Sequence, residues 1–116
     1  MVRDRLGVKP LYYHFAGKTL RFASSMKALF AFKAVARVLD HSAAAHYLRT
    51  IRTTLGRQTL IKGIYALGPG ESLLWRPGST NYVEPSVYWN LLTLSRADGQ
   101  RGLSFSDACE ETKERF

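Results

Sequence analysis

The 116-residue sequence predicts an α+β fold, in which two β-hairpins form an antiparallel sheet and helices pack on one face of it. Two pairs of short apolar segments, each pair separated by a glycine-containing turn, predict the hairpins. Helix-forming segments that begin at Ser or Asp lie between and after these pairs. A composition of 46% hydrophobic and 12% aromatic residues is ordinary for one globular domain with a modest core.

The first hairpin is predicted near the start of the chain. Apolar and aromatic runs at residues 8–15 and 19–23 flank a turn at 16–18, whose central Gly17 suits a tight reversal. Because side chains alternate along a strand, we expect Tyr12 and Tyr13 on opposite faces of the first strand.

A short helix is predicted directly after this hairpin. Ser24 and Ser25 offer hydroxyl oxygens as N-caps. Met26, Leu29 and Phe30 then follow at i, i+3 and i+4, a spacing that places them on one helical face.

A second helical region is predicted over residues 33–48. Asp40 and Ser42 are candidate N-caps before a run of alanines, which form helices readily. Residues 50–62 are polar and β-branched with several basic side chains, and we expect a loop there.

The second hairpin is predicted in the last part of the domain. A short apolar strand at residues 63–67 leads into a Gly-Pro-Gly turn at 68–70. Residues 71–76 and 82–89 are expected to pair across a turn at 77–80. The chain is therefore divided into a domain at residues 1–92, a linker at 93–103 and a final helix at 104–116.

The charge is strongly positive and unevenly distributed. The net charge is +8, and Asp40 is the only acidic residue between Arg5 and Gly70. Basic residues are scattered singly, so a solvated basic surface, or one that faces an acidic domain, is expected rather than nucleic-acid binding. No apolar run approaches the roughly 20 residues that cross a bilayer. The start of the chain does not resemble a secretory signal, so we expect a cytoplasmic protein without membrane contact.

No residue type in the sequence forms a pattern that indicates catalysis or metal binding. Cys109 is the only cysteine and is flanked by acidic residues, so we expect a small buried apolar side chain rather than a nucleophile. His14, His41 and His46 have no acidic or cysteine partner at metal-ligand spacing. We therefore predict no catalytic, cofactor-binding or metal-binding residue in this chain.

Two stretches of the sequence, residues 4–13 and 22–29, resemble motifs of a known protein family. The decapeptide DRLGVKPLYY, followed at short range by FASSMKAL, resembles the second half of the glutaminase domain of glutamine-hydrolysing asparagine synthetases. The apolar strand with its Pro-Gly turn and the Tyr88-Trp89 pair also match that family. Ser25 is a departure, because the family usually has Glu there. In this interpretation Asp4 and Gly7 belong to the scaffold.

The resemblance implies a fold and a parent activity. The fold would be the C-terminal half of an N-terminal-nucleophile αββα sandwich, plus the start of the linker to a synthetase domain. The parent enzyme would hydrolyse glutamine, pass the ammonia through the protein and amidate aspartate with ATP and magnesium. The family nucleophile is an N-terminal cysteine, whereas Val2 follows Met1 here. No Ser-Gly-Gly or Asp-Ser-Ser pattern of an ATP site is present either.

The sequence is thus expected to be an inactive fragment of such an enzyme. Its implied partners are the missing N-terminal half and the synthetase domain, and without them we expect marginal stability or self-association. Two alternatives stay open: an amidotransferase-like relative that acts on another acceptor, and a stand-alone basic binding module.

Overall fold

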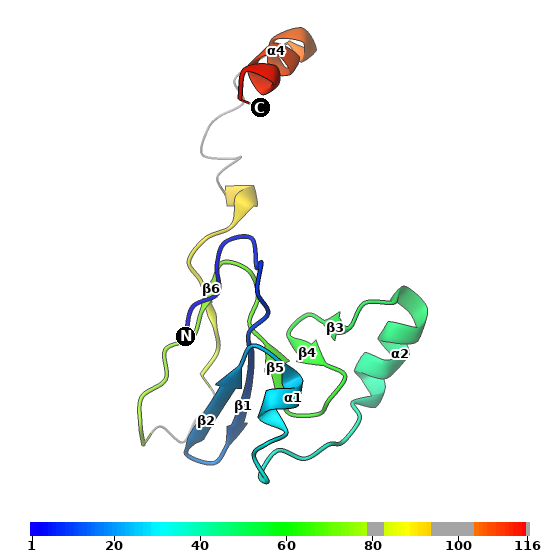
Figure 1. The fold of residues 1–116 in the computed structure, drawn as a ribbon, viewed down its shortest axis with the longest axis vertical. Helices are drawn as coiled ribbons and strands as arrows, with labels where there is room; N and C mark the ends of the chain where they lie inside the picture. Colours follow the sequence, from blue (N-terminus) through cyan, green and yellow to red (C-terminus); the bar gives the residue numbers. More distant parts are fainter. Residues whose placement is uncertain (79–82, 94–103, 116) are drawn as a thin grey trace.

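The computed structural model describes residues 1–78, 83–93 and 104–115. These residues form a five-stranded sheet of order β2-β1-β5-β4-β3 and a two-stranded sheet of β6 and β7, together with helices α1, α2 and α4 (Figure 1). Every strand pair is antiparallel. The α+β class with antiparallel sheets is confirmed, but the two predicted hairpins lie in different sheets.

The first hairpin consists of β1 (Tyr12–Ala16) and β2 (Thr19–Ala23). Gly17 has a φ of 57° in the turn, a conformation that glycine adopts at little cost. The first strand begins at Tyr12 rather than at residue 8. The reason is local, because the carbonyl oxygens of Gly7 and Lys9 accept hydrogen bonds from the Arg3 guanidinium instead of from a neighbouring strand.

Helix α1 (Met26–Leu29) begins where the sequence predicts. The Ser25 hydroxyl accepts a hydrogen bond from the Ala28 amide at 3.3 Å, which satisfies one of the free donors of the first turn. The helix packs against β1 and β2 and buries Leu29 completely.

Helix α2 (His41–Thr50) is shorter than the predicted region of residues 33–48. Asp40, rather than Ser42, is the N-cap, and its carboxylate accepts from the Ala43 amide at 3.0 Å. Residues 33–39 are not helical. Part of this segment is extended instead, because the Asp40 amide donates to the Leu60 carbonyl at 2.9 Å and Leu39 forms a β-bridge with Ile61.

The loop predicted at residues 50–62 contains a hairpin. Strands β3 (Thr54–Leu55) and β4 (Gln58–Thr59) pair around Gly56, which has a φ of 59°. Strand β4 also pairs with β5, so this hairpin forms one edge of the larger sheet. Two-residue strands carry too little alternation to be recognised in the sequence.

The predicted strand before the Gly-Pro-Gly turn is β5 (Ile64–Ala66), and it lies between β1 and β4. The second predicted hairpin is present as β6 (Glu71–Ser72) and β7 (Ser86–Val87), which are much shorter than the predicted strands. Residues 79–82 of its predicted turn and partner strand lie outside the described residues.

Helix α4 (Phe105–Arg115) confirms the last predicted helix. The Asp107 amide donates to the Ser104 hydroxyl at 3.2 Å, and the Asp107 carboxylate accepts from the Ser104 amide at 3.3 Å, as in a capping box. Cys109 is exposed on this helix, so the predicted buried position was wrong. Most of the predicted linker, residues 94–103, lies outside the described part.

Two clusters of buried side chains lie on opposite faces of the larger sheet. One contains Tyr13, Leu67 and Leu73, and Tyr65 stacks on Tyr13 with ring centroids 5.6 Å apart. The other contains Leu29, Val35 and Ile64, with Tyr12 packed against it under α1. The opposite orientation of Tyr12 and Tyr13 is therefore confirmed. Across the described residues, no helix is long and apolar enough to cross a bilayer.

Candidate functional site

Three segments that the sequence marks as motifs meet between the two sheets. We call this region the motif junction and define it as residues 3–10, 67–71 and 88–89. The Asp4 carbonyl accepts hydrogen bonds from the amides of Gly7 and Gly70, at 3.1 and 3.0 Å. The Tyr88 hydroxyl donates to the Arg3 carbonyl at 2.7 Å. The first and last motifs, 85 residues apart in sequence, are thus joined directly.

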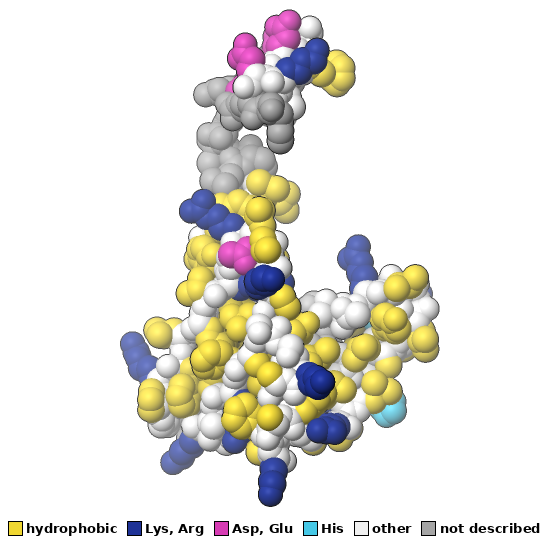
Figure 2. Space-filling view, in the orientation of Figure 1, with side chains coloured by type: hydrophobic (Ala, Val, Ile, Leu, Met, Phe, Trp, Pro, Cys, Tyr) yellow, Lys and Arg dark blue, Asp and Glu magenta, His cyan; other side chains and the backbone are white. Residues whose placement is uncertain are grey.

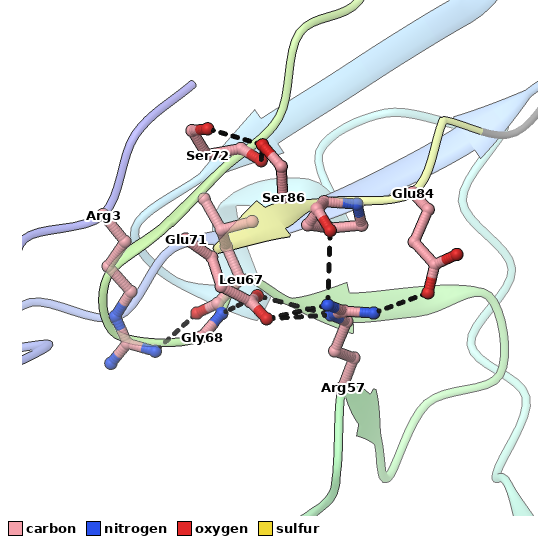
Figure 3. Close-up of polar contacts among 9 residues, drawn as sticks. Arg3, Arg57, Leu67, Gly68, Glu71, Ser72, Glu84 and Ser86 are labelled. Atoms are coloured by element: carbon pink, nitrogen blue, oxygen red, sulfur yellow. Dashed lines mark hydrogen bonds and ion pairs between the residues drawn. The ribbon is translucent and has the colours of Figure 1, made fainter. Parts of the chain in front are cut away.

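Arg3 holds two of these segments together through its side chain. Its guanidinium donates to the carbonyl oxygen of Leu67 at 2.6 Å (Figure 3). It also donates to the carbonyl oxygens of Gly7 and Lys9, both at 2.9 Å. A planar guanidinium with several fixed donors suits such a set of backbone acceptors. Arg3 therefore completes the backbone hydrogen bonding of an irregular loop.

Asp4 organises the turn after Arg3. Its carboxylate accepts from the amides of Leu6 and Val8, both at 3.1 Å. The hydrogen bond from the Val8 amide is the main cause that lowers the pKa of this carboxyl below its usual value. No ion pair in the described residues joins Asp4 to Arg3 or Arg5, so hydrogen bonds from backbone amides hold this turn.

Two glycines are required by close approaches inside the junction. Gly7 has a φ of 66°, and a Cβ there would lie 2.7 Å from Pro69 Cγ. Gly70 has a φ of 65°, and a Cβ there would overlap the carbonyl oxygen of Trp89. The segments can pack this tightly because glycine has no side chain and tolerates positive φ.

An ion-pair cluster lies beside the junction and joins the two sheets. Arg57, in the β3–β4 turn, donates from Nη2 to the Glu71 carboxylate at 2.8 Å and from Nη1 to Glu84 at 3.2 Å (Figure 3). Its Nη2 also reaches the Pro85 carbonyl at 3.4 Å. The Glu71 carboxylate accepts from the Gly68 amide at 2.7 Å. The larger sheet is thereby tied to β6 and to the two residues that precede β7.

Glu71 is ionised in this environment although it is mostly buried. Burial alone would raise the pKa of the Glu71 carboxyl, but hydrogen bonds from Arg57 and the Gly68 amide outweigh it and lower the pKa. The same carboxylate raises the pKa of Arg57. Each charge is therefore compensated by the other, and the ion pair links the two sheets.

A cavity of about 360 Å³ opens next to Glu71. Its walls include Pro69, Val87 and Leu91, and the Arg5 guanidinium lies 6.0 Å from the centre of the Trp89 ring at its edge. The cavity is largely apolar with a cationic side, and it has no hydroxyl or thiol in its lining. These residues could hold an apolar group, and the Glu71 carboxylate in the lining is already bonded to Arg57.

The other residues considered from the sequence lie on three different elements. His14 is on β1, His41 and His46 are on α2, and Cys109 is on α4. Among the described residues, no three His, Cys, Asp or Glu side chains gather as metal ligands. That the chain has no catalytic or cofactor-binding residue remains a prediction.

Arg57 and Glu71 were missed by the sequence interpretation. A signal for Glu71 was available, because it is the only acidic residue between Asp40 and Glu84 in a strongly basic chain. An isolated carboxylate in such a context has a high chance of pairing with one of the many cations. No local signal distinguishes Arg57 from the other basic residues of its segment.

Comparisons with known proteins agree with these motifs. A family model described as glutamine amidotransferase domain matches residues 1–89. An asparagine synthetase (glutamine-hydrolyzing) 3 of Bacillus subtilis is 26% identical over 98% of this chain and 17% of that protein. "Amidase chry2" of Gibberella zeae and "Amidase chyE" of Penicillium rubens are each 32% identical over 77% of this chain and 12% of their own lengths. The chain therefore spans less than a fifth of these relatives. No solved structure matches it.

Proposed function

Because this chain belongs to the glutamine amidotransferase domain family, we propose that it is a segment of a glutamine-hydrolysing amidotransferase of the asparagine synthetase type. The observation that carries the proposal is the motif junction. The DRLG motif and the Tyr-Trp pair, which support the resemblance, both form backbone hydrogen bonds with Gly70 of the Gly-Pro-Gly motif. In this proposal the chain supplies scaffold to a larger catalytic domain.

The parent reaction that we propose is hydrolysis of glutamine, followed by ATP-dependent amidation of aspartate. The fold would be part of an N-terminal-nucleophile αββα sandwich in a cytoplasmic enzyme. Residues 1–92 would belong to the glutaminase domain and α4 to the start of the synthetase domain. This chain does not fit ATP and magnesium, because it has neither the Ser-Gly-Gly nor the Asp-Ser-Ser pattern. That chemistry would belong to other parts of the parent.

Exposed apolar side chains support the proposal of missing partners. Leu6, Val8 and Leu74 are each more than 70% exposed. Figure 2 shows hydrophobic side chains spread over the body of the molecule, with basic side chains distributed singly among them. An apolar surface of this kind is typical of a face that another domain covers. The scattered charges favour this interpretation over nucleic-acid binding.

The first experiment is the mass of the natural gene product. An antibody against the β1–β2 hairpin, followed by intact mass spectrometry, should detect a polypeptide several times heavier than 13.1 kDa. The purified 116-residue chain should release no ammonia from glutamine, whereas the longer product should do so. A natural product of 13.1 kDa, or glutaminase activity of the short chain alone, would contradict the proposal.

A second candidate is an amidotransferase-like protein that acts on an acceptor other than aspartate. The 32% identity to two fungal proteins named as amidases favours it, because it exceeds the 26% identity to the asparagine synthetase. The longer product distinguishes the two candidates. Asparagine formation from glutamine, aspartate and ATP supports the first, whereas glutamine hydrolysis without asparagine formation supports the second.

A further inference from the structure

We propose that His14 and Arg21 form a binding site for a small oxyanion, such as a carboxylate group, on the face of the larger sheet that α1 covers. The two residues lie opposite each other in the pairing of β1 with β2. His14 is only 9% exposed. Its Nδ1 atom and the Nη1 atom of Arg21 are both buried and have no hydrogen-bond partner. Buried polar atoms are rarely left in this state.

Neighbouring groups hold both side chains in place. The backbone of Gly63 packs against the imidazole, since a Cβ on Gly63 would lie 3.7 Å from His14 Cδ2. The Arg21 guanidinium lies over the Phe32 ring, 5.7 Å from its centre. An arginine so positioned loses little further side-chain entropy when it binds a ligand.

The segments that form and cover this face contain no acidic residue. Their lysines, Lys27, Lys33 and Lys62, are exposed. Asp40, the sole acidic residue between Arg5 and Gly70, already caps α2. Among the described residues, no carboxylate pairs with these two buried nitrogens.

An oxyanion fits this arrangement chemically. Its oxygens accept hydrogen bonds from a guanidinium and from an imidazole N–H, and charge-assisted bonds of this kind are among the strongest in proteins. Burial and the charge of Arg21 lower the pKa of His14, so the free imidazole is neutral at pH 7. A bound anion would oppose both effects and draw a proton onto His14. Its affinity should then fall by up to about tenfold per pH unit above the His14 pKa, the limit for uptake of one proton.

The test is an NMR titration of the three histidines in the full chain. Acetate or sulfate replaces chloride at constant ionic strength, and the pKa of each imidazole is measured. We expect the His14 pKa to rise saturably with acetate, with sulfate or with both, while His41 and His46 on α2 do not respond. A response to acetate alone would identify a site for planar carboxylates, and a response to sulfate alone a site for tetrahedral oxyanions.

Matched variants assign the response to the site. Arg21→Gln should abolish it, whereas Arg49→Gln, which removes the same charge from the exposed side of α2, should not. The proposal would be overturned if neither anion changed the His14 pKa, or changed it no more than those of His41 and His46. A bridging water would then be the partner of the two buried nitrogens. If Arg21→Gln does not fold, the comparison of His14 with the two other histidines in the unchanged chain decides the question.

Discussion

Two partly buried arginines have opposite polar surroundings. Arg57 bonds to the carboxylates of Glu71 and Glu84 and to a backbone carbonyl. Arg21 faces a buried imidazole and leaves one terminal nitrogen without a partner. The charge of Arg57 is compensated by carboxylates, and these bonds hold the two sheets together. The region around Arg21 retains two nitrogens without partners, which we interpret as a capacity to bind an anion.

The difference between the two arginines follows from where the few acidic residues of this basic chain lie. Glu71 is the only carboxylate between Asp40 and Glu84, and it is placed where the motif junction meets both sheets. Removing one partner of such a buried pair is costly because the other charge is left uncompensated. The hairpin under α1 has no such pair, so its stability depends on apolar packing and local caps.

The largest effect is expected from a glycine in the motif junction. Gly70→Ala places a Cβ against the Trp89 carbonyl at positive φ and should lower the free energy of unfolding by about 3 kcal/mol or more. Gly17→Ala is the matched control in the hairpin turn, where φ is also positive but no atom lies within 4 Å. It should cost about 1 kcal/mol. Equal losses in urea denaturation would show that the close approach at Gly70 is unimportant.

The next largest loss of unfolding free energy is expected when Arg57 is replaced, and replacing Arg21 gives the comparison. Arg57→Met leaves the Glu71 carboxylate unpaired and should cost about 2 to 3 kcal/mol, less than for a fully buried pair because Arg57 is 31% exposed. Arg21→Met removes an unsatisfied donor and keeps most of the aliphatic stem, so the change should stay within about 1 kcal/mol. Chemical denaturation measures both. A larger loss for Arg21→Met than for Arg57→Met would reverse our interpretation of the two regions.

A smaller effect is expected at the start of α1, which covers the hairpin. Ser25→Ala removes the hydroxyl that accepts from the Ala28 amide and should cost about 0.5 to 1 kcal/mol. Ser24→Ala changes a neighbouring exposed serine and should stay within about 0.5 kcal/mol. Thermal unfolding followed by circular dichroism compares them. If the two variants melt alike, the cap contributes nothing measurable.

The smallest expected effect is on the pH dependence of the unfolding free energy, to which His14 and Glu71 contribute in different pH ranges. The folded pKa of His14 is lowered, so the unfolded chain binds more protons and stability falls as pH drops from about 6.5 towards the folded pKa. The folded pKa of Glu71 is also lowered, so its contribution is complete above about 4.5 and is lost as pH falls through the folded pKa.

Single substitutions should remove the contribution of each residue to the curve of unfolding free energy against pH. His14→Gln should flatten the upper part of the curve of unfolding free energy against pH, and Glu71→Gln the lower part. His41→Gln, on exposed α2, is the control and should change neither. An upper step that persists in His14→Gln would mean that another group titrates there.

Local chemistry predicted much of the fold. The β1–β2 hairpin follows from a glycine between two apolar runs, and α1 begins at a predicted Ser cap. Helix α4 lies within the predicted final helix. The first strand was predicted to begin at residue 8 but begins at Tyr12, because the Arg3 side chain bonds to the carbonyl oxygens of Gly7 and Lys9. Residues 33–39 were predicted as helix from composition, but pairing with residues 60–62 holds part of them extended.

By itself, the sequence determined the features that depend on residues a few positions apart: turns, caps, the alternation of Tyr12 and Tyr13, and the family motifs. Only the tertiary structure decided which distant groups meet. Arg57 and Glu71 are 14 residues apart, Arg3 and Leu67 are 64 apart, and neither pair lies within one element. Such contacts depend on how the sheets pack, and strands of two residues carry no periodicity that would reveal the packing. The unsatisfied His14 and Arg21 nitrogens likewise become apparent only when the strands are paired and covered.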